Sequence, residues 1–209
     1  MTAAALTAAV VHDVKNRLVL LGEELAKLAA LPLGSEAQAH VAAANEQAMQ
    51  LTGKLVEWLT VQKATADGGL RAATHEEIPE LFLEDLIAQA RPLVPAHIEL
   101  ASDIAFDVPP LWFFDRQLVQ LALDSALHNA LRFARSRIVM GVRCEGPMLC
   151  FFVHDDGPGV QSQPAPTSTG LGTKLCEQVA RAHRNRGLSG HCRLGDHDRQ
   201  GALFELFLP

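Results

Sequence analysis

The chain has 209 residues, of which 48% are hydrophobic, and a formal net charge of −6. This length suits one large domain or two small ones, and the apolar content is sufficient for a buried core. The acidic balance argues against a nucleic-acid-binding surface and against binding to anionic membranes. No apolar run approaches the roughly 20 residues that span a bilayer, and no basic segment precedes an apolar one at the N-terminus. We therefore expect a soluble, cytoplasmic protein.

Cysteine and histidine spacing gives no sign of a metal site. The four cysteines form no CxxC pair, and no Cys/His grouping has the spacing of a zinc finger. His183, His191 and His197 lie close in sequence, but we expect them on a helix end, a strand and a loop. A metal site built from them is therefore not expected.

Two apolar stripes with helical spacing mark the first sixty residues. The first stripe consists of Leu6, Val10, Val14, Leu18, Leu21, Leu25 and Leu28. After a break at residues 31–34, the second consists of Val41, Ala44, Ala48, Leu51, Leu55 and Trp58 or Leu59. Two such helices joined by a short loop form an antiparallel hairpin. Pairing two hairpins into a four-helix bundle would bury both stripes, so we expect a homodimer.

The composition changes after a linker at Ala64–Gly69, and eight of the nine phenylalanines follow residue 100. We expect helices at Pro79–Arg91, Asp115–Ala134 and Thr173–His183. We expect strands at His97–Leu100, Ile104–Val108, Arg137–Arg143, Met148–Val153 and Ala202–Leu208. This order predicts an α/β sandwich with helices on one face of a mixed sheet. The predicted domains are a helical hairpin at 1–66 and an α/β domain at 72–209.

His12 lies away from the first apolar stripe, about 200° around the helix from Val14. Asn16 shares its face and Asp13 is adjacent to it. An exposed neutral imidazole is nucleophilic near neutral pH, and a neighbouring carboxylate can take its proton. A surface histidine on a helix is usually inert. The helix alone therefore does not show that His12 is a nucleophile.

The segment from His12 to Leu18 (HDVKNRL) resembles the H-box of histidine kinases, H-[DE]-x-[KR]-[NT]-P-L. The resemblance implies that His12 is the phosphoacceptor and that Asp13 assists proton removal. Asn16 would orient water for dephosphorylation of a partner response regulator. Arg17 departs from the pattern, because the family usually has a proline there that helps to kink the helix.

The predicted helix 115–134 resembles the N-box of the same family. The resemblance implies that Asn129 binds Mg²⁺, which prefers oxygen ligands. It places Arg132 at the nucleotide phosphates and the adjacent Phe133 in the nucleotide pocket. An ordinary amphipathic helix with a polar edge is the alternative for this segment. Ser125 departs from the pattern, because the family usually has asparagine there and related ATPases have a water-activating glutamate.

Two glycine-containing motifs follow. Residues 153–160 (VHDDGPGV) resemble the G1 box, D-x-G-x-G, in which Asp155 accepts a hydrogen bond from adenine while Gly157 and Gly159 allow close backbone approach. Residues 169–175 (TGLGTKL) resemble the G2 box, in which Gly170, Leu171 and Gly172 place free helix N–H groups on phosphate. Taken alone, each is also consistent with a tight turn or a helix start.

Residues 201–209 resemble the closing strand of the same domain, so the resemblance covers the chain from His12 to Pro209. It implies a dimeric histidine-phosphotransfer hairpin followed by a GHKL-type ATP-binding domain with ATP and Mg²⁺ as cofactors. The stretch 161–168, where the family has its ATP lid, is short. Ser168 replaces a glycine of the G2 pattern, and Ala202 replaces a threonine often found near adenine. The short lid predicts weaker ATP binding or slower autophosphorylation.

The leading hypothesis is a histidine kinase that phosphorylates His12 from ATP and passes the phosphoryl group to an aspartate of a response-regulator receiver domain. His12 lies so near the N-terminus that we expect a sensor-less protein, which either is regulated by a separate sensor protein or acts mainly as a relay. One alternative is a histidine phosphotransferase with a degenerate nucleotide domain. Another is a non-catalytic protein that binds a regulator.

Overall fold

The computed structural model describes residues 70–160, 171–196 and 201–209, together with scattered positions between Val14 and Trp58. The chain divides into two compact units, Met1–Lys63 and Ala64–Pro209. Of the predicted site residues, His12, Asp13, Asn16 and Gly170 lie outside the described residues, as does the segment 161–168.

In the first unit, the described positions from 14 to 28 and from 37 to 58 have helical backbone. The carbonyl of Gly34 accepts a hydrogen bond of 3.0 Å from the Gln38 amide, a pairing of the kind that opens a helix. These positions agree with two helical segments on either side of the predicted break. The four-helix bundle formed by two copies remains a prediction.

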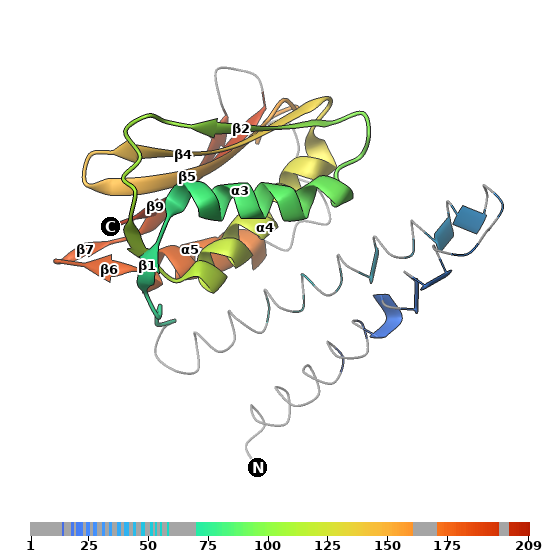
Figure 1. The fold of residues 1–209 in the computed structure, drawn as a ribbon, viewed down its shortest axis with the longest axis horizontal. Coiled ribbons are helices and arrows are strands. Elements are labelled where there is room, and N and C mark those ends of the chain that lie inside the picture. The colour runs from blue at the N-terminus through green and yellow to red at the C-terminus, as the bar shows by residue number, and fades with distance from the viewer. Residues whose placement is uncertain are drawn as a thin grey trace, which may run out of the picture. The chain divides into compact units, whose positions relative to one another are not determined.

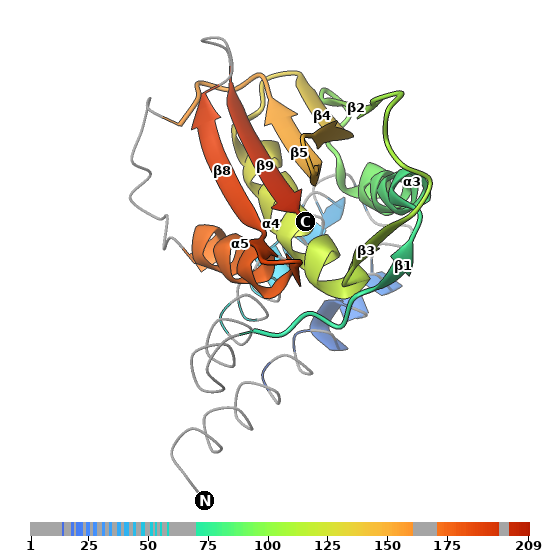
Figure 2. The same ribbon diagram turned by 90° about the vertical axis from the view of Figure 1, so that its left-hand side faces the viewer.

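The second unit is built on a five-stranded mixed sheet with the strand order β2-β4-β5-β9-β8. Its strands are β2 (Glu99–Ile104), β4 (Arg137–Glu145), β5 (Met148–Asp155), β8 (His191–Asp196) and β9 (Ala202–Leu208). β2 pairs with β4 in parallel, and the other pairs are antiparallel. The helices α3 (Pro79–Ala90), α4 (Arg116–Phe133) and α5 (Leu171–Ala182) cover one face of the sheet (Figures 1 and 2). The predicted α/β sandwich is confirmed.

Smaller elements complete the unit. They are the 3-10 helix η1 (Arg91–Leu93) and the strands β1 (His75–Glu77), β3 (Trp112–Phe114), β6 (Arg184–Asn185) and β7 (Leu188–Ser189). β1 pairs with β3, and β6 pairs with β7, each in an antiparallel two-stranded ribbon. Sequence patterns predicted none of these four strands, because each is short or mostly exposed and so lacks a clear apolar alternation. For β8, only His191 was expected on a strand, and no bounds were predicted.

The prediction of two separate strands at His97–Leu100 and Ile104–Val108 is wrong. One strand, β2, runs through residues 99–104, and the chain leaves the sheet after Ile104. β2 is an edge strand, so the polar side chains of Ser102 and Asp103 stay exposed without breaking its pairing with β4. Two polar residues in the middle of the strand were therefore mistaken for a connection.

Aromatic packing and capping fix the helices on the sheet. Phe82 of α3, Phe114 of β3 and Phe151 of β5 are buried and meet edge to face, with ring centroids 5.1 to 5.6 Å apart. Asp115 caps α4, because its carboxylate accepts hydrogen bonds from the amides of the second and third helical residues. α4 therefore starts at a fixed place against the core.

His183, at the end of α5, is a buried structural link. Its Nδ1–H donates to the Val179 carbonyl at 2.8 Å, and its Nε2 accepts from the Asp115 amide at 3.0 Å. Both contacts require the neutral imidazole, because a carbonyl only accepts and an amide N–H only donates. Burial lowers the pKa of His183 below the ordinary 6.5, although the hydrogen bond to Val179 and the charge of Asp115 oppose this shift.

We expect His183 to make the stability of the protein fall as the pH falls below about 6.5. The unfolded chain binds a proton there while the folded chain does not, so stability is full above the unfolded pKa and is lost toward the folded one. His183→Gln removes this dependence and lowers the unfolding free energy at neutral pH by about 1–3 kcal/mol. Urea unfolding between about pH 5 and 8 measures both effects. The exposed His97→Gln serves as the control, and an unchanged pH profile in His183→Gln would contradict the assignment.

Candidate functional site

The site is centred on Asp155, the last residue of β5. Its carboxylate is 5% exposed and lies on the helix-covered face of the sheet. Oδ1 accepts hydrogen bonds from the amides of Gly157 at 2.8 Å and Ala202 at 3.4 Å. Oδ2 accepts none from the described residues and is not fully buried, so it is open to a hydrogen bond from a bound molecule.

Glycines are required around Asp155 because the backbone is crowded there. A Cβ at Gly157 would lie 2.5 Å from the Phe133 carbonyl oxygen and 2.7 Å from Asp155 Oδ1. A Cβ at Gly201 would lie 1.6 Å from the Asp155 carbonyl oxygen, and Gly201 has a φ of +80°. Any side chain at these two positions would displace the turn that follows β5.

The end of α4 lies beside this turn. The contact between the Phe133 carbonyl and Gly157 brings the predicted N-box together with the predicted G1 box. Asn129, Arg132 and Phe133 are exposed on the last turns of the helix, with the Arg132 guanidinium 5.2 Å from the centroid of the Phe133 ring. Ser125, one turn before Asn129, is buried. The sequence motifs therefore converge in space, although they lie more than twenty residues apart.

α5 begins at Leu171, two residues earlier than predicted. Leu171 and Gly172 consequently lie in its first turn and not in front of it. The first N–H groups of a helix have no partner within the helix and attract anions. α5 packs beside α4, where the Cys176 thiol lies 3.6 Å from the Ala122 carbonyl. The free N–H groups of α5 thus belong to the same helical layer as Asn129.

Two aspartates that sequence reasoning missed hold the turn in place. Asp156 accepts hydrogen bonds from the Ser136 hydroxyl at 2.6 Å and the Arg135 amide at 2.7 Å, which ties the turn to the α4–β4 connection. Partial burial acts to raise the pKa of Asp156, but the hydrogen bonds from Ser136, Arg137 and Arg135 outweigh it and hold the pKa well below its usual range. Its position next to Asp155 was the only sequence signal.

Asp196, the last residue of β8, holds the other end of the turn. Its Oδ1 accepts a hydrogen bond from the Val160 amide. Gly159 passes so close that a Cβ there would lie 2.5 Å from the same oxygen, and its φ is +84°. Asp196 lies 36 residues from Val160 in the sequence, so no local pattern could have identified it.

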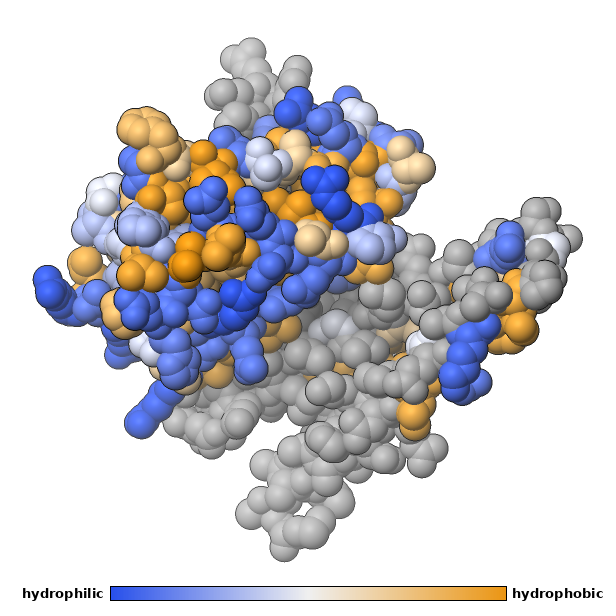
Figure 3. All heavy atoms as spheres, viewed as in Figure 1, coloured by the Kyte–Doolittle hydropathy of each residue, from blue (hydrophilic) through white to orange (hydrophobic). Residues whose placement is uncertain are grey.

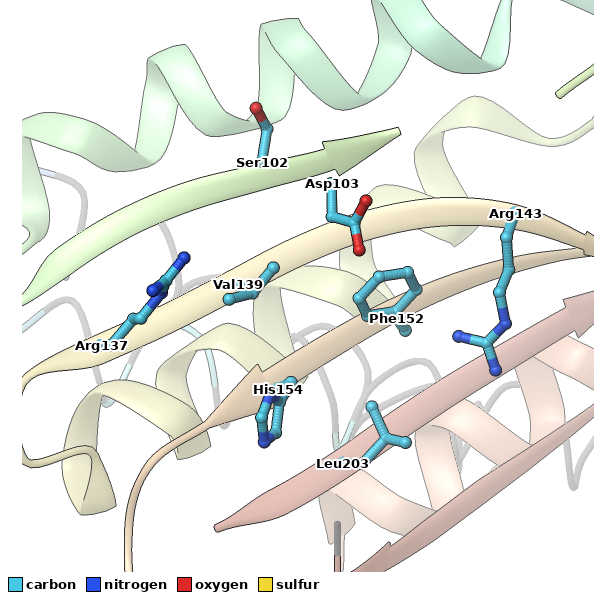
Figure 4. Close-up of a pocket in the computed structure, with 8 residues that line it drawn as sticks. All are labelled: Ser102, Asp103, Arg137, Val139, Arg143, Phe152, His154 and Leu203. Atoms are coloured by element: carbon cyan, nitrogen blue, oxygen red, sulfur yellow. The ribbon is translucent and has the colours of Figure 1, made fainter. Parts of the chain in front are cut away.

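The other face of the sheet is covered by none of the helices α3, α4 and α5 of the second unit, and it has a hollow of about 470 Å³. Val139, Phe152 and Leu203 form its apolar part, and Arg137, Arg143 and His154 are among its polar lining residues (Figure 4). Successive strand residues point to opposite faces, so His154 faces this hollow while Asp155 faces the helices. The hollow is therefore separate from the Asp155 site.

The sheet face opposite to the helices, which contains the hollow, also carries charged side chains. Glu205 is buried between Arg143 and Arg193, and both guanidiniums pair with its carboxylate. The guanidinium carbon of Arg143 lies 5.1 Å from the centroid of the Phe152 ring. That of Arg193 lies 4.6 Å from the centroid of the Phe207 ring. The arginines thus cover aromatic side chains on the sheet face that lies opposite to α3, α4 and α5, which is a structural role.

The described residues contain no group of three or more His, Cys, Asp or Glu side chains that could hold a metal ion. A Mg²⁺ ion that accompanies a nucleotide needs only one or two protein oxygens, because phosphates and water supply the rest. The exposed amide of Asn129 fits that requirement. No helix among the described residues is long and apolar enough to cross a membrane.

The family described as "Histidine kinase-, DNA gyrase B-, and HSP90-like ATPase" matches residues 114–209. No curated protein matches the chain. Among solved structures, full-length ShkA, crystallised with AMPPNP, aligns over all of this chain and 46% of its own length at 20% identity and a TM-score of 0.69. The chain thus spans less than half of ShkA.

Two further structures have the same fold. The histidine kinase AdeS of Acinetobacter baumannii aligns over 91% of this chain and 94% of its own at 13% identity and a TM-score of 0.62. The cytoplasmic segment of the histidine kinase QseC aligns over 75% and 94% at 17% identity and a TM-score of 0.57. Residues 114–209 therefore match the histidine kinase-, DNA gyrase B- and HSP90-like ATPase family, and the chain has the fold of a histidine-kinase ATPase core.

Proposed function

We propose that the protein is a histidine kinase that transfers the γ-phosphoryl group of ATP to His12 and then to an aspartate of a response-regulator receiver domain. The observation that carries this proposal is the buried carboxylate of Asp155, which keeps one oxygen unoccupied at a glycine turn of the ATPase fold. A donor such as the exocyclic amino group of adenine complements that oxygen.

The remaining nucleotide contacts follow from the same arrangement. Gly157 and Gly159 let the backbone approach the base and ribose, and Asn129 supplies an oxygen to Mg²⁺. Arg132 neutralises phosphate charge, with Phe133 beside it. The first N–H groups of α5, at Leu171 and Gly172, face phosphate in the way that helix N-termini bind anions. Catalysis then consists mainly of positioning and charge neutralisation.

His12 is the acceptor in this proposal. A ring nitrogen of the neutral imidazole attacks the γ-phosphorus, so that an N–P bond forms as the bond to the ADP oxygen breaks. Asp13 takes the proton from the other ring nitrogen, and Asn16 orients water when the phosphoryl group is removed from the regulator. These three assignments rest on the sequence resemblance, since the residues lie outside the described part of the chain.

A homodimer is part of the same proposal. Leu21, Leu28 and Leu51, which belong to the two apolar stripes of the first unit, are 48%, 43% and 56% exposed in the single chain. Exposed leucines at helical spacing favour burial against a second copy, which forms a four-helix bundle. The partner in phosphotransfer is a receiver domain, whose aspartate accepts the phosphoryl group.

A second candidate function keeps the fold without the kinase step. Ser125 and Ala202 stand where the family has asparagine and threonine, and Ala202 reaches Asp155 only through its backbone amide. These features favour a histidine phosphotransferase that moves phosphoryl groups between regulators through His12. A protein that binds a regulator without any catalysis is a third candidate.

Labelling with γ-³²P ATP and Mg²⁺ separates the three functions. The kinase incorporates acid-labile, base-stable label that disappears in His12→Gln, while the exposed His40→Gln retains it. The phosphotransferase acquires label only from a phosphorylated receiver domain, again through His12. Absence of label from either donor, with regulator binding intact in His12→Gln, would favour the third function.

Asp196 should influence nucleotide affinity without touching the nucleotide, because it positions the turn at Gly159. We expect Asp196→Ala to weaken ADP binding by about fivefold, which corresponds to one hydrogen bond of about 1 kcal/mol. Asp196→Asn keeps the acceptor oxygen and should restore most of the affinity. Calorimetric titration with ADP measures this, with the exposed Asp103→Ala on the opposite sheet face as the control. Equal affinity in wild type and Asp196→Ala would refute the positioning role.

A further inference from the structure

An apolar surface that the proposed function does not use lies on the ribbon formed by β1 and β3. The register pairs Glu76 with Phe113 and Glu77 with Trp112, so continuing it by one residue places Ile78 opposite Leu111. Because side chains alternate along a strand, Phe113, Leu111 and Ile78 share the face opposite to the buried Phe114. Leu81 follows one turn after Ile78, at the start of α3. We call these four residues the ribbon patch.

The side chains of the ribbon patch are open to solvent although each is large and apolar. Ile78 is 41% exposed, Leu81 52%, Leu111 46% and Phe113 61%. Figure 3 shows hydrophobic side chains at the surface near β1 and the start of α3, bordered by hydrophilic ones. Single exposed apolar residues need no explanation, but several adjacent ones usually mark an interaction site.

The ribbon patch lies over a part of the fold that is held in place by core packing and ion pairs. Directly beneath it, Phe114 and Phe82 are buried in the aromatic core, and Pro79 starts α3. Arg116 bridges Glu77 and Asp85 at 3.1 and 2.7 Å, which ties β1 and α3 to the start of α4. A surface held in this way loses little conformational freedom when a partner binds.

Carboxylates outnumber basic side chains in the segment that carries the ribbon patch. Residues 72–115 contain nine carboxylates and a single arginine, Arg91; Arg116, which follows them, pairs with Glu77 and Asp85. Glu76 pairs with Phe113 in the sheet register, and Glu80 precedes Leu81 in the sequence. Both glutamates are exposed. An apolar centre with an acidic rim selects a partner of matching shape and opposite charge.

We propose that the ribbon patch binds a protein segment whose apolar side chains are flanked by lysine or arginine. The apolar centre supplies the burial, while Glu76 and Glu80 pair with the flanking cations. The same charge repels nucleic acid and anionic membranes, and it repels the ribbon patch of a second copy. A basic partner is thus the occupant that both the apolar residues and the carboxylates favour.

Two helical peptides of about 14 residues, one of leucine and lysine and one of leucine and glutamate with the same pattern, test this charge selection. Trp58→Phe leaves Trp112 of β3, next to Phe113, as the only tryptophan reporter. We expect saturable binding of the Leu/Lys peptide alone, with an affinity that falls about tenfold between roughly 50 and 500 mM salt. Equal binding of both peptides would overturn the proposal.

Variants locate the binding on the ribbon patch. In the same background, Phe113→Thr keeps a strand-forming residue and should weaken Leu/Lys peptide binding about tenfold, as should Glu76→Lys combined with Glu80→Lys. The control is Leu194→Thr, an equally exposed leucine on β8, which should bind as the parent does. Leu81→Gln on α3 repeats the test on a helix if Phe113→Thr is unstable in urea unfolding. Unchanged affinity in the patch variants would contradict the proposal. Self-association of the chain that Phe113→Thr abolishes would also contradict it, because the patch would then bind a second copy.

Discussion

The second unit of the protein is organised around a carboxylate that folding removes from water. Asp155 ends a strand whose other residues, except His154, are buried, and its own side chain faces the helices. The Gly157 and Ala202 amides satisfy one of its oxygens. Such a group is tolerated only where donors are fixed in place, so the turn after β5 and the start of β9 must meet there. The glycines of both segments follow from that requirement, because no side chain fits between them.

The surroundings of the turn extend this arrangement to three other elements. The Phe133 carbonyl brings the end of α4 against Gly157, Asp156 ties the turn to the α4–β4 connection, and Asp196 secures its last residue from β8. Farther away, the neutral His183 joins the end of α5 to the cap of α4. The residues proposed to bind nucleotide therefore lie on elements that are linked by hydrogen bonds of the fold itself. We infer that the same contacts determine nucleotide affinity and part of the stability.

The layered fold could be predicted from the sequence, and so could the place of Asp155 at a strand end before a glycine-containing turn, because both depend on local patterns. The apolar run of β5 followed by Asp155, and the spacing of α4 up to Phe133, are strong local signals. The strands β1 and β3 were missed, β8 was expected only at His191, and β2 was divided, because their pairing depends on neighbours distant in sequence and not on apolar alternation. For the same reason Asp196 and His183 could not be assigned: an aspartate that holds a turn 36 residues earlier resembles any exposed aspartate in the sequence. The start of α5 was placed two residues late because glycine is a poor helix former, yet Gly172 lies in the first turn.

We expect Asp155 to present a carboxylate oxygen to the amino group of a purine base. Calorimetric titrations with ATP and with inosine triphosphate test this contact, because inosine triphosphate has a carbonyl in place of the 6-amino group. ATP should bind at least about tenfold more tightly, because a carbonyl would face the carboxylate without a proton between them. Asp155→Asn, whose amide can donate, should reduce this preference. Equal affinity of the wild-type protein for the two nucleotides would show that Asp155 does not bind the amino group.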